Sequence, residues 1–347
     1  MINILYILIA LIILSLIVTS HEFGHFFVGK KLGFKIIGFS VGMGPALFKR
    51  TRKGTEYAIR AFPIGGMCQF VGEEDPSDTK EGSFNSFPAW KRLLVILAGP
   101  VMNILLALVL SVFVLMAYGN YMPQIYSIDP NNTPAACSEL SQGDVIVSVD
   151  GKNITFYNEV FTYIQDASPE KMDIRVKRDG TERTVTLNNI YNEEKQSNFL
   201  GVTIAPVQLK YGFFESISFS FKYIYGIVRE TFAFFGTLFN GTVKNTDVAG
   251  PIGTIAYVSQ AVKYGFETIL QMSILISISL GIMNILPIPA LDGGRILFIV
   301  IEMIIGKPLN RKIENYIHLG GFALLMVLIL FLTYNDIVSL IKGSFQL

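Results

Sequence analysis

Residues 1–25 read MINILYILIALIILSLIVTSHEFGH, and this stretch decides both the fold class and the chemistry of the chain. Residues 1–20 carry no charge, and a helix needs about 20 apolar residues to cross a membrane. His21, Glu22 and His25 follow at once, so three polar groups stand at the end of an apolar segment. Buried polar groups without partners are unfavourable, and ionisable residues at membrane depth are therefore candidates for function.

A cleaved signal peptide is the alternative interpretation of this first run. It would need a basic region before the apolar core and small residues at a cleavage site, and residues 1–20 have neither. We therefore interpret the run as a membrane span that stays in the protein.

The composition agrees with a membrane protein. Hydrophobic residues make up 51% of the 347-residue chain and charged residues 16%, whereas soluble domains carry about 25% charged residues. The net charge of +1 lacks the basic excess of a nucleic-acid binder. The two cysteines, Cys68 and Cys137, exclude a disulfide scaffold.

Four apolar runs predict a polytopic α-helical membrane protein with four transmembrane helices: residues 1–20, 93–119, 268–291 and 315–335. The loop after the first run holds eleven basic and six acidic residues, which places it in the cytoplasm. We expect both chain ends, and the long connection after the second run, to be extracytoplasmic. Cys68 and Cys137 then lie on opposite sides of the membrane, so we expect no disulfide between them.

The connection at residues 121–208 predicts a small mixed α/β domain. Residues 145–149 read as a strand, and Asp150-Gly151 and Asp179-Gly180 read as tight turns. Residues 132–136 (NTPAA), followed by Gly143-Asp144, resemble a PDZ domain of the bacterial protease type. Such domains bind peptides by strand addition, so we expect peptide binding or steric filtering of substrates, with a plain spacer domain as the alternative.

The spacing of His21 and His25 favours a metal site. Residues four apart share one face of a helix, so both imidazoles can reach one cation with Glu22 close to a bound water. Catalytic zinc needs a third protein ligand, and Asp292, at the end of the third apolar run, is the best candidate. Pro287 and Pro289 precede Asp292, and such irregular backbone is tolerated at membrane depth where it lines a cavity.

Three further features have less specific interpretations. Residues 54–70 suggest a hairpin that dips toward the site at Gly65-Gly66. Residues 98–100 (AGP) with Asn103, and residues 250–253 (GPIG), suggest helix packing and a loop turn. His318 has no second ligand at a suitable spacing, and we interpret it as interfacial.

With these residues placed, the chain resembles the site-2 protease family of intramembrane zinc metalloproteases, in particular the bacterial regulator of sigma-E protease type. The resemblance covers nearly the whole chain, and it includes a single PDZ domain where better known members have two. It rests on six segments: residues 21–25, 65–66, 98–100, the PDZ-like insert, 250–253 and 284–294.

The resemblance implies four parts: residues 1–120 with two spans, the HExxH site and a membrane-reentrant β-hairpin; 121–208, the extracytoplasmic PDZ-like domain; 209–264, amphipathic linker helices; and 265–347, two further spans with the third zinc ligand. It implies one Zn²⁺ per chain held by His21, His25 and Asp292, with Glu22 as the catalytic base. It also implies substrate-binding roles for Asn284, Gly65 and Gly66.

The same resemblance implies regulated intramembrane proteolysis in the bacterial inner membrane. The partners would be membrane lipid and single-span membrane proteins, such as anti-sigma factors and signal-peptide remnants, often trimmed beforehand by a site-1 type protease; nucleic acid is not expected. Two other functions remain open. A zinc transporter would need further polar residues along its spans, and a catalytically silent membrane scaffold would not need Glu22.

Overall fold

The computed structural model describes residues 4–73, 80–131, 133–135, 138–193, 196–240, 249–307 and 309–341. The chain divides into two compact units. The first combines Met1–Ser111 with Ile227–Leu347, and the second is Val112–Gly226. Cys137, and with it the expectation about a disulfide, lies outside the described residues.

Four helices of the described chain are long and apolar enough to cross a membrane: α1 (Ile4–Lys31), α2 (Ala89–Ala117), α6 (Phe266–Ile285) and residues Lys312–Ile341 of α8 (Arg311–Ile341). Large apolar side chains such as Val109 and Leu324 are exposed along them. Extended apolar surface of this kind is unfavourable in water and suits contact with lipid. Each helix coincides with one of the four predicted apolar runs, and the chain is a multi-pass membrane protein.

The third span ends earlier than its apolar run suggests. Helix α6 stops at Ile285, and an irregular loop leads to the short helix α7 (Asp292–Ile305). Pro287 and Pro289 explain the break, because proline donates no backbone hydrogen bond and disfavours helical geometry in the residue before it. The break places Asp292 at the start of a helix.

The GPIG segment at residues 250–253 begins helix α5 (Pro251–Tyr264). Its backbone N–H groups are bound by a side chain of α8: Gly250 N and Gly253 N donate to the two carboxylate oxygens of Asp336, at 3.1 and 2.8 Å. Asp336 is buried, and a carboxylate at a helix N-terminus is favoured by the helix dipole. The segment is therefore more than a turn, because it connects α5 to α8.

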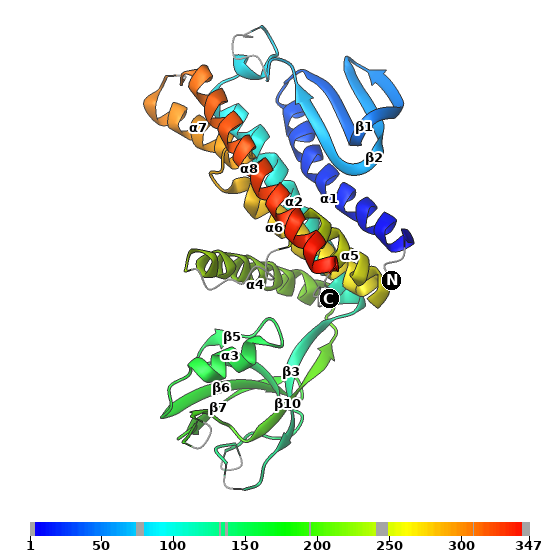
Figure 1. Cartoon of the computed structure of the whole chain (residues 1–347). Helices are drawn as coiled ribbons and strands as arrows, with labels where there is room; N and C mark the ends of the chain where they lie inside the picture. Colours follow the sequence, from blue (N-terminus) through cyan, green and yellow to red (C-terminus); the bar gives the residue numbers. More distant parts are fainter. Residues whose placement is uncertain are drawn as a thin grey trace. The chain divides into compact units, whose positions relative to one another are not determined.

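Strands β1 (Ile36–Arg52) and β2 (Thr55–Phe70) form one long hairpin beside α1 (Figure 1). Lys53 and Gly54 make its turn with φ of 49° and 81°, the left-handed conformation that two-residue hairpin turns favour. The prediction that both arms of the hairpin lie within residues 54–70 is wrong, because that stretch is β2 alone. Gly42, Gly44 and Pro45 interrupt the alternation of residues 36–52 and hide the partner strand.

The second unit contains a sheet with the order β10-β3-β4-β6-β7, and β5 pairs with β4. Its strands are β3 (Asn120–Ile128), β4 (Val145–Val149), β5 (Lys152–Asn153), β6 (Lys171–Arg178), β7 (Thr181–Asn188) and β10 (Val202–Leu209). The unit also contains helix α3 (Glu159–Asp166) and the pair β8 (Tyr191–Asn192) and β9 (Ser197–Asn198). The turns at residues 150–151 and 179–180 have positive φ, as their Asp-Gly sequences predict.

The core of this unit lies between the sheet and α3. Ile146, Val160 and Ile174 are fully buried in it, one each from β4, α3 and β6. After β10 the chain enters α4 (Phe213–Phe239), a 27-residue helix in which Phe214 and Tyr225 are largely exposed. This helix lies in the region where the resemblance implies amphipathic linker helices. The 3₁₀ turn η1 (Phe84–Ser86) belongs to the first unit and precedes α2.

A buried ion pair supports one end of the sheet. Asp144 is fully buried and accepts hydrogen bonds from Arg178 Nε at 2.6 Å, from Arg178 Nη2 at 2.7 Å and from Ser141 N at 2.9 Å. Burial alone would raise the pKa of Asp144, but the hydrogen bonds from Arg178 and Ser141 outweigh it and hold this pKa below its usual value.

The ion pair predicts how the stability of this unit depends on pH. Because the pKa of Asp144 is lower in the folded state, its contribution is present above the unfolded pKa of about 3.9 and is lost as pH falls through the folded pKa. We expect Arg178→Gln to lower the urea concentration at which β4 opens at about pH 7. The difference in this midpoint between the variant and wild type should become smaller at about pH 3. Pulsed hydrogen exchange of β4 peptides in the whole protein measures both. An equal gap at both pH values would contradict the assignment.

Candidate metal centre

Helix α1 places two histidines on one face, directed into the protein. His21 and His25 are 5% and 7% exposed, and their ring centroids are 4.8 Å apart. Both Nε2 atoms point to the same place, because His21 Nε2 and His25 Nε2 are only 3.1 Å apart. The one-turn spacing in the sequence therefore produces a converging pair of imidazole nitrogens.

Asp292 completes a cluster of three. Its Oδ2 atom is 2.9 Å from His21 Nε2 and 3.3 Å from His25 Nε2, although 271 residues separate His21 from Asp292. The side chain is 19% exposed and stands in the first turn of α7. Within the described residues, His21, His25 and Asp292 form the group that could hold a metal ion.

The hydrogen bonds of His25 fix which nitrogen faces the cluster. Its Nδ1 atom lies 2.9 Å from the carbonyl oxygen of Val95 on α2, and a carbonyl can only accept, so Nδ1 carries the proton. In the neutral imidazole, Nε2 is then an unprotonated lone pair directed at Asp292 and His21. A lone pair facing a carboxylate oxygen at 3.3 Å is repulsive unless a cation or a proton lies between them.

Zinc fits this donor set. Two imidazole nitrogens and one carboxylate oxygen form the three-ligand set of catalytic zinc sites, which leave a fourth position open. Tetrahedral bonds of about 2.0–2.1 Å to zinc put neighbouring ligand atoms about 3.3 Å apart. The three ligand atoms here are separated by 2.9, 3.1 and 3.3 Å.

Asn103 on α2 is a neighbour of the cluster that the sequence analysis assigned only to helix packing. It is fully buried, and its side-chain amide nitrogen lies 3.3 Å from His21 Nδ1. Its backbone carbonyl oxygen accepts a hydrogen bond from Ser277 Oγ on α6 at 2.8 Å. When His21 Nε2 binds a metal, Nδ1 carries a proton and needs an acceptor. Turning the amide by about 180° exchanges its N and O and brings Oδ1, which otherwise has no partner among the described residues, to that position.

Glycines let α2 approach the cluster. A Cβ at Gly99 would overlap the Nε2 atoms of His25 and His21, and a Cβ at Gly24 would overlap the carbonyl of Ala98. No other residue type leaves this space, so the AGP segment has a specific role: it allows α2 to pack directly against the histidine face of α1. Gly293 acts similarly on α7, where a Cβ would overlap the carbonyls of Ile285 and Leu286.

Glu22 points to the hairpin side of α1. Its carboxylate Oε2 accepts a hydrogen bond from the backbone N–H of Cys68 at 2.9 Å. Gly66 packs against it, since a Cβ at that position would lie 3.1 Å from Glu22 Cγ, and Gly65 O accepts from Ser15 Oγ at 3.4 Å. The structure therefore brings the Gly65-Gly66 segment of β2 next to Glu22.

Two other residues lie apart from the cluster. Asn284 is half-buried in the last turn of α6. Within the described part of the chain, it forms no hydrogen bond with His21, His25 or Asp292. His318 is not a ligand, but it does have a partner: the backbone N–H of Ala290 donates to its Nδ1 at 2.9 Å. The sequence pattern could not reveal this contact, because it joins α8 to the loop before α7.

Apolar helices surrounding a buried His-His-Asp cluster, with a glutamate directly after the first histidine, define a zinc peptidase that works within the membrane. The model of peptidase family M50 matches residues 9–328 of the chain, and the protein belongs to that family. It is therefore a zinc metalloprotease of the site-2 protease family.

Curated relatives are similar in sequence to this chain over nearly its full length. A protein of Fusobacterium nucleatum named for zinc metalloprotease activity is 34% identical over 336 residues, with 96% of this chain and 98% of the relative covered. Zinc metalloprotease RasP of Shouchella clausii is 29% identical over 411 residues, covering 94% of this chain and 97% of RasP. Among solved structures, the PDZ domain of an SdrC-like protein from Listeria innocua is similar at 20% identity and a TM-score of 0.22, over 24% of this chain and 92% of that one.

The close approach at Gly99 predicts that an alanine substitution is harmful here, although it usually stabilises a helix. Alanine is about 1 kcal/mol better than glycine inside a helix, yet Gly99→Ala should weaken zinc binding about 10-fold or more, because its methyl group displaces both histidines. Zinc per chain, measured by mass spectrometry during titration with a chelator, tests this.

The matched control is Gly320→Ala on α8, where a Cβ meets no atom within 4 Å. This variant should hold zinc as wild type does. Wild-type zinc affinity in Gly99→Ala would show that α2 does not pack as closely on the histidines as described.

Proposed function

We propose that the chain is an endopeptidase that cuts single-span membrane proteins inside their hydrophobic segment, with one zinc ion per chain held by His21, His25 and Asp292. The observation that supports this most is the cluster itself, in which two imidazole nitrogens and one carboxylate oxygen converge within 3.3 Å between apolar helices. A hydrogen-bonded polar cluster with no metal is the simpler alternative; it needs a second proton on His25, at Nε2, because Val95 already holds one on Nδ1.

Glu22 is the proposed base. Zinc held by the three ligands supplies Lewis-acid chemistry that polarises a carbonyl and lowers the pKa of water toward neutrality. The Glu22 carboxylate takes one proton from the attacking water as its oxygen forms a bond to the scissile carbonyl carbon. Glu22 then gives that proton to the amide nitrogen as the C–N bond breaks, so the products are a carboxylic acid and an amine, and the acid then passes its remaining proton to the amine or to water.

Substrate binding is assigned to the Gly65-Gly66 segment and to Asn284. A membrane-spanning helix has its backbone groups already paired, so it must unwind before its carbonyls can react. Residues 66–70 of β2 pair with residues 36–41 of β1 on one side, and Glu22 bonds Cys68 N. An unwound substrate added as a strand near Gly66 would lie next to the base, and Asn284 would supply a further hydrogen bond.

The position in the membrane follows from the charge pattern. We place the hairpin as a reentrant element on the cytoplasmic side, and both chain ends and the PDZ-like domain outside, in the bacterial inner membrane. There the PDZ-like domain would bind or filter substrates such as anti-sigma factors or signal-peptide remnants after an earlier cut by another protease. The zinc transporter is less favoured, because a half-buried glutamate bonded to a strand backbone suits a base better than an ion path.

The test is cleavage of a purified single-span substrate in detergent. We expect wild type to cut within the hydrophobic segment and Glu22→Gln to lose about 100- to 10,000-fold in rate while it keeps zinc, because only the proton transfer is removed. Asp292→Asn should lose both zinc and cleavage. Mass spectrometry of the products locates the cut.

Glu56→Gln is the matched control, since Glu56 is an exposed carboxylate next to the hairpin turn. It should cut as wild type does. Cleavage by Glu22→Gln at the wild-type rate would reject Glu22 as the base, and a scaffold function would be favoured if no variant or substrate gave cleavage in the hydrophobic segment.

A further inference from the structure

The loop that presents Asp292 has a backbone conformation that needs support. Residues 286–291 join α6 to α7, and Ala290 has φ of 75° in the left-handed region that alanine rarely adopts. Such conformations persist only where the surrounding structure holds them, and they are common at functional sites. Ala290 is two residues before Asp292, so a change at Ala290 would move the carboxylate.

Helix α8 supplies contacts that hold this loop. The N–H of Ala290 donates to His318 Nδ1 at 2.9 Å. A Cβ at Gly321 would overlap Pro289, and a Cβ at Gly294 would lie 3.1 Å from His318 Cε1. His318 and Gly321 are three residues apart, on one face of α8, so a single helix face packs directly on the loop.

We infer that His318 is a positioning residue for Asp292: it fixes the loop through the Ala290 N–H and so sets where the third ligand lies. The inference rests on the proposed role of Asp292 as a zinc ligand. It goes beyond that role because no residue of α8 belongs to the cluster of His21, His25 and Asp292.

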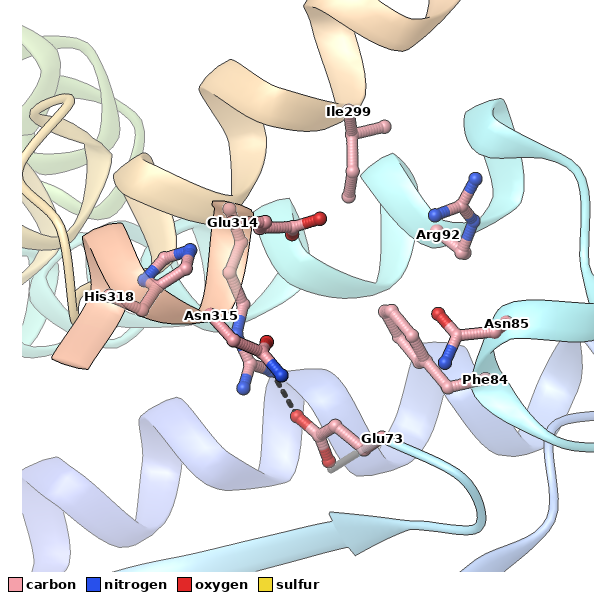
Figure 2. Close-up of a pocket in the computed structure, with 9 residues that line it drawn as sticks. Glu73, Phe84, Asn85, Arg92, Ile299, Glu314, Asn315 and His318 are labelled. Atoms are coloured by element: carbon pink, nitrogen blue, oxygen red, sulfur yellow. Dashed lines mark hydrogen bonds and ion pairs between the residues drawn. The ribbon is translucent and has the colours of Figure 1, made fainter. Parts of the chain in front are cut away.

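The other side of His318 faces a polar cavity (Figure 2). Because Nδ1 accepts from Ala290, the neutral ring carries its proton on Nε2, which is buried and has no partner among the described residues. The cavity is about 90 Å³ in volume, enough for several water molecules. The carboxylates of Glu73 and Glu314 line it as well.

Ion pairs anchor the walls of this cavity. Arg295, in the first turn of α7, pairs with Glu73, which follows β2. Arg92 at the start of α2 pairs with Glu302 on α7 at 2.5 Å, and both side chains are largely buried. Helix α7 is therefore attached to α2 and to the hairpin, and His318 provides the corresponding attachment of the preceding loop to α8.

Three variants separate positioning from packing. In His318→Asn, the side-chain oxygen takes nearly the place of Nδ1 and can accept from Ala290 N–H; in His318→Gln the amide lies nearer the place of Nε2; and His318→Leu keeps volume alone. For Gln and Leu we expect kcat to fall and the dissociation constant of zinc to rise, each about 10-fold or more, with KM unchanged. His318→Asn should stay within about threefold of wild type in both.

The thermal midpoint of each variant is measured alongside. If His318→Asn and His318→Leu have equal thermal midpoints but differ in zinc affinity, the result supports a positioning role. The inference fails if Asn and Leu lose zinc affinity equally, or if Leu binds zinc and cuts as wild type does. It also fails if the losses of zinc affinity and kcat are proportional to the fall in thermal midpoint across all three variants.

Asp292→Asn, run in parallel, separates this inference from the proposed function. If Asp292→Asn keeps zinc and cleavage, the proposed ligand set is wrong and the role of His318 falls with it. If Asp292→Asn loses both while His318→Leu loses neither, the ligand set stands and only the positioning role of His318 is rejected.

Discussion

The convergence of two imidazole nitrogens on one carboxylate oxygen is the constraint on which the rest of the first unit depends. His25 cannot relieve it by turning its protonated nitrogen inward, because Val95 O holds Nδ1–H at 2.9 Å. Without a cation or a second proton on His25, such a cluster would be unfavourable between apolar helices. With zinc, the same distances become those of a coordination shell, and metal binding contributes directly to holding α1 and α7 together.

The packing around the cluster serves this geometry. Gly24 and Gly99 let α1 and α2 approach until the histidines touch the α2 backbone, and small residues at helix interfaces are typical of membrane proteins. The loop before Asp292 departs from helical geometry where Pro289 packs against α8 at Gly321. These features make a rigid set of ligands, which a hydrolytic site needs, from helices that are otherwise apolar.

The sequence alone predicts the four spans, and it singles out the histidine pair and Asp292, which the structure brings together; the reasons are physical. Apolar length sets the spans, helical spacing pairs His21 with His25, and Asp292 is a carboxylate that follows a proline-broken apolar run. The partner of β2 was missed because the glycines and proline of residues 42–45 remove the alternation on which a strand prediction depends. Contacts such as those of Asn103 and His318 join separate helices, so no local pattern could show them; a buried asparagine in the middle of an apolar span was the one available signal.

The coordination of zinc in the purified protein tests the central claim most directly. X-ray absorption at the zinc edge reports the identity and distance of the ligand atoms. The account predicts one zinc per chain with two imidazole nitrogens and carboxylate or water oxygens at about 2.0–2.1 Å, and no sulfur. A sulfur ligand at about 2.3 Å would contradict it, because the set of His21, His25 and Asp292 contains no sulfur; a protein that binds no zinc at neutral pH would contradict it as well.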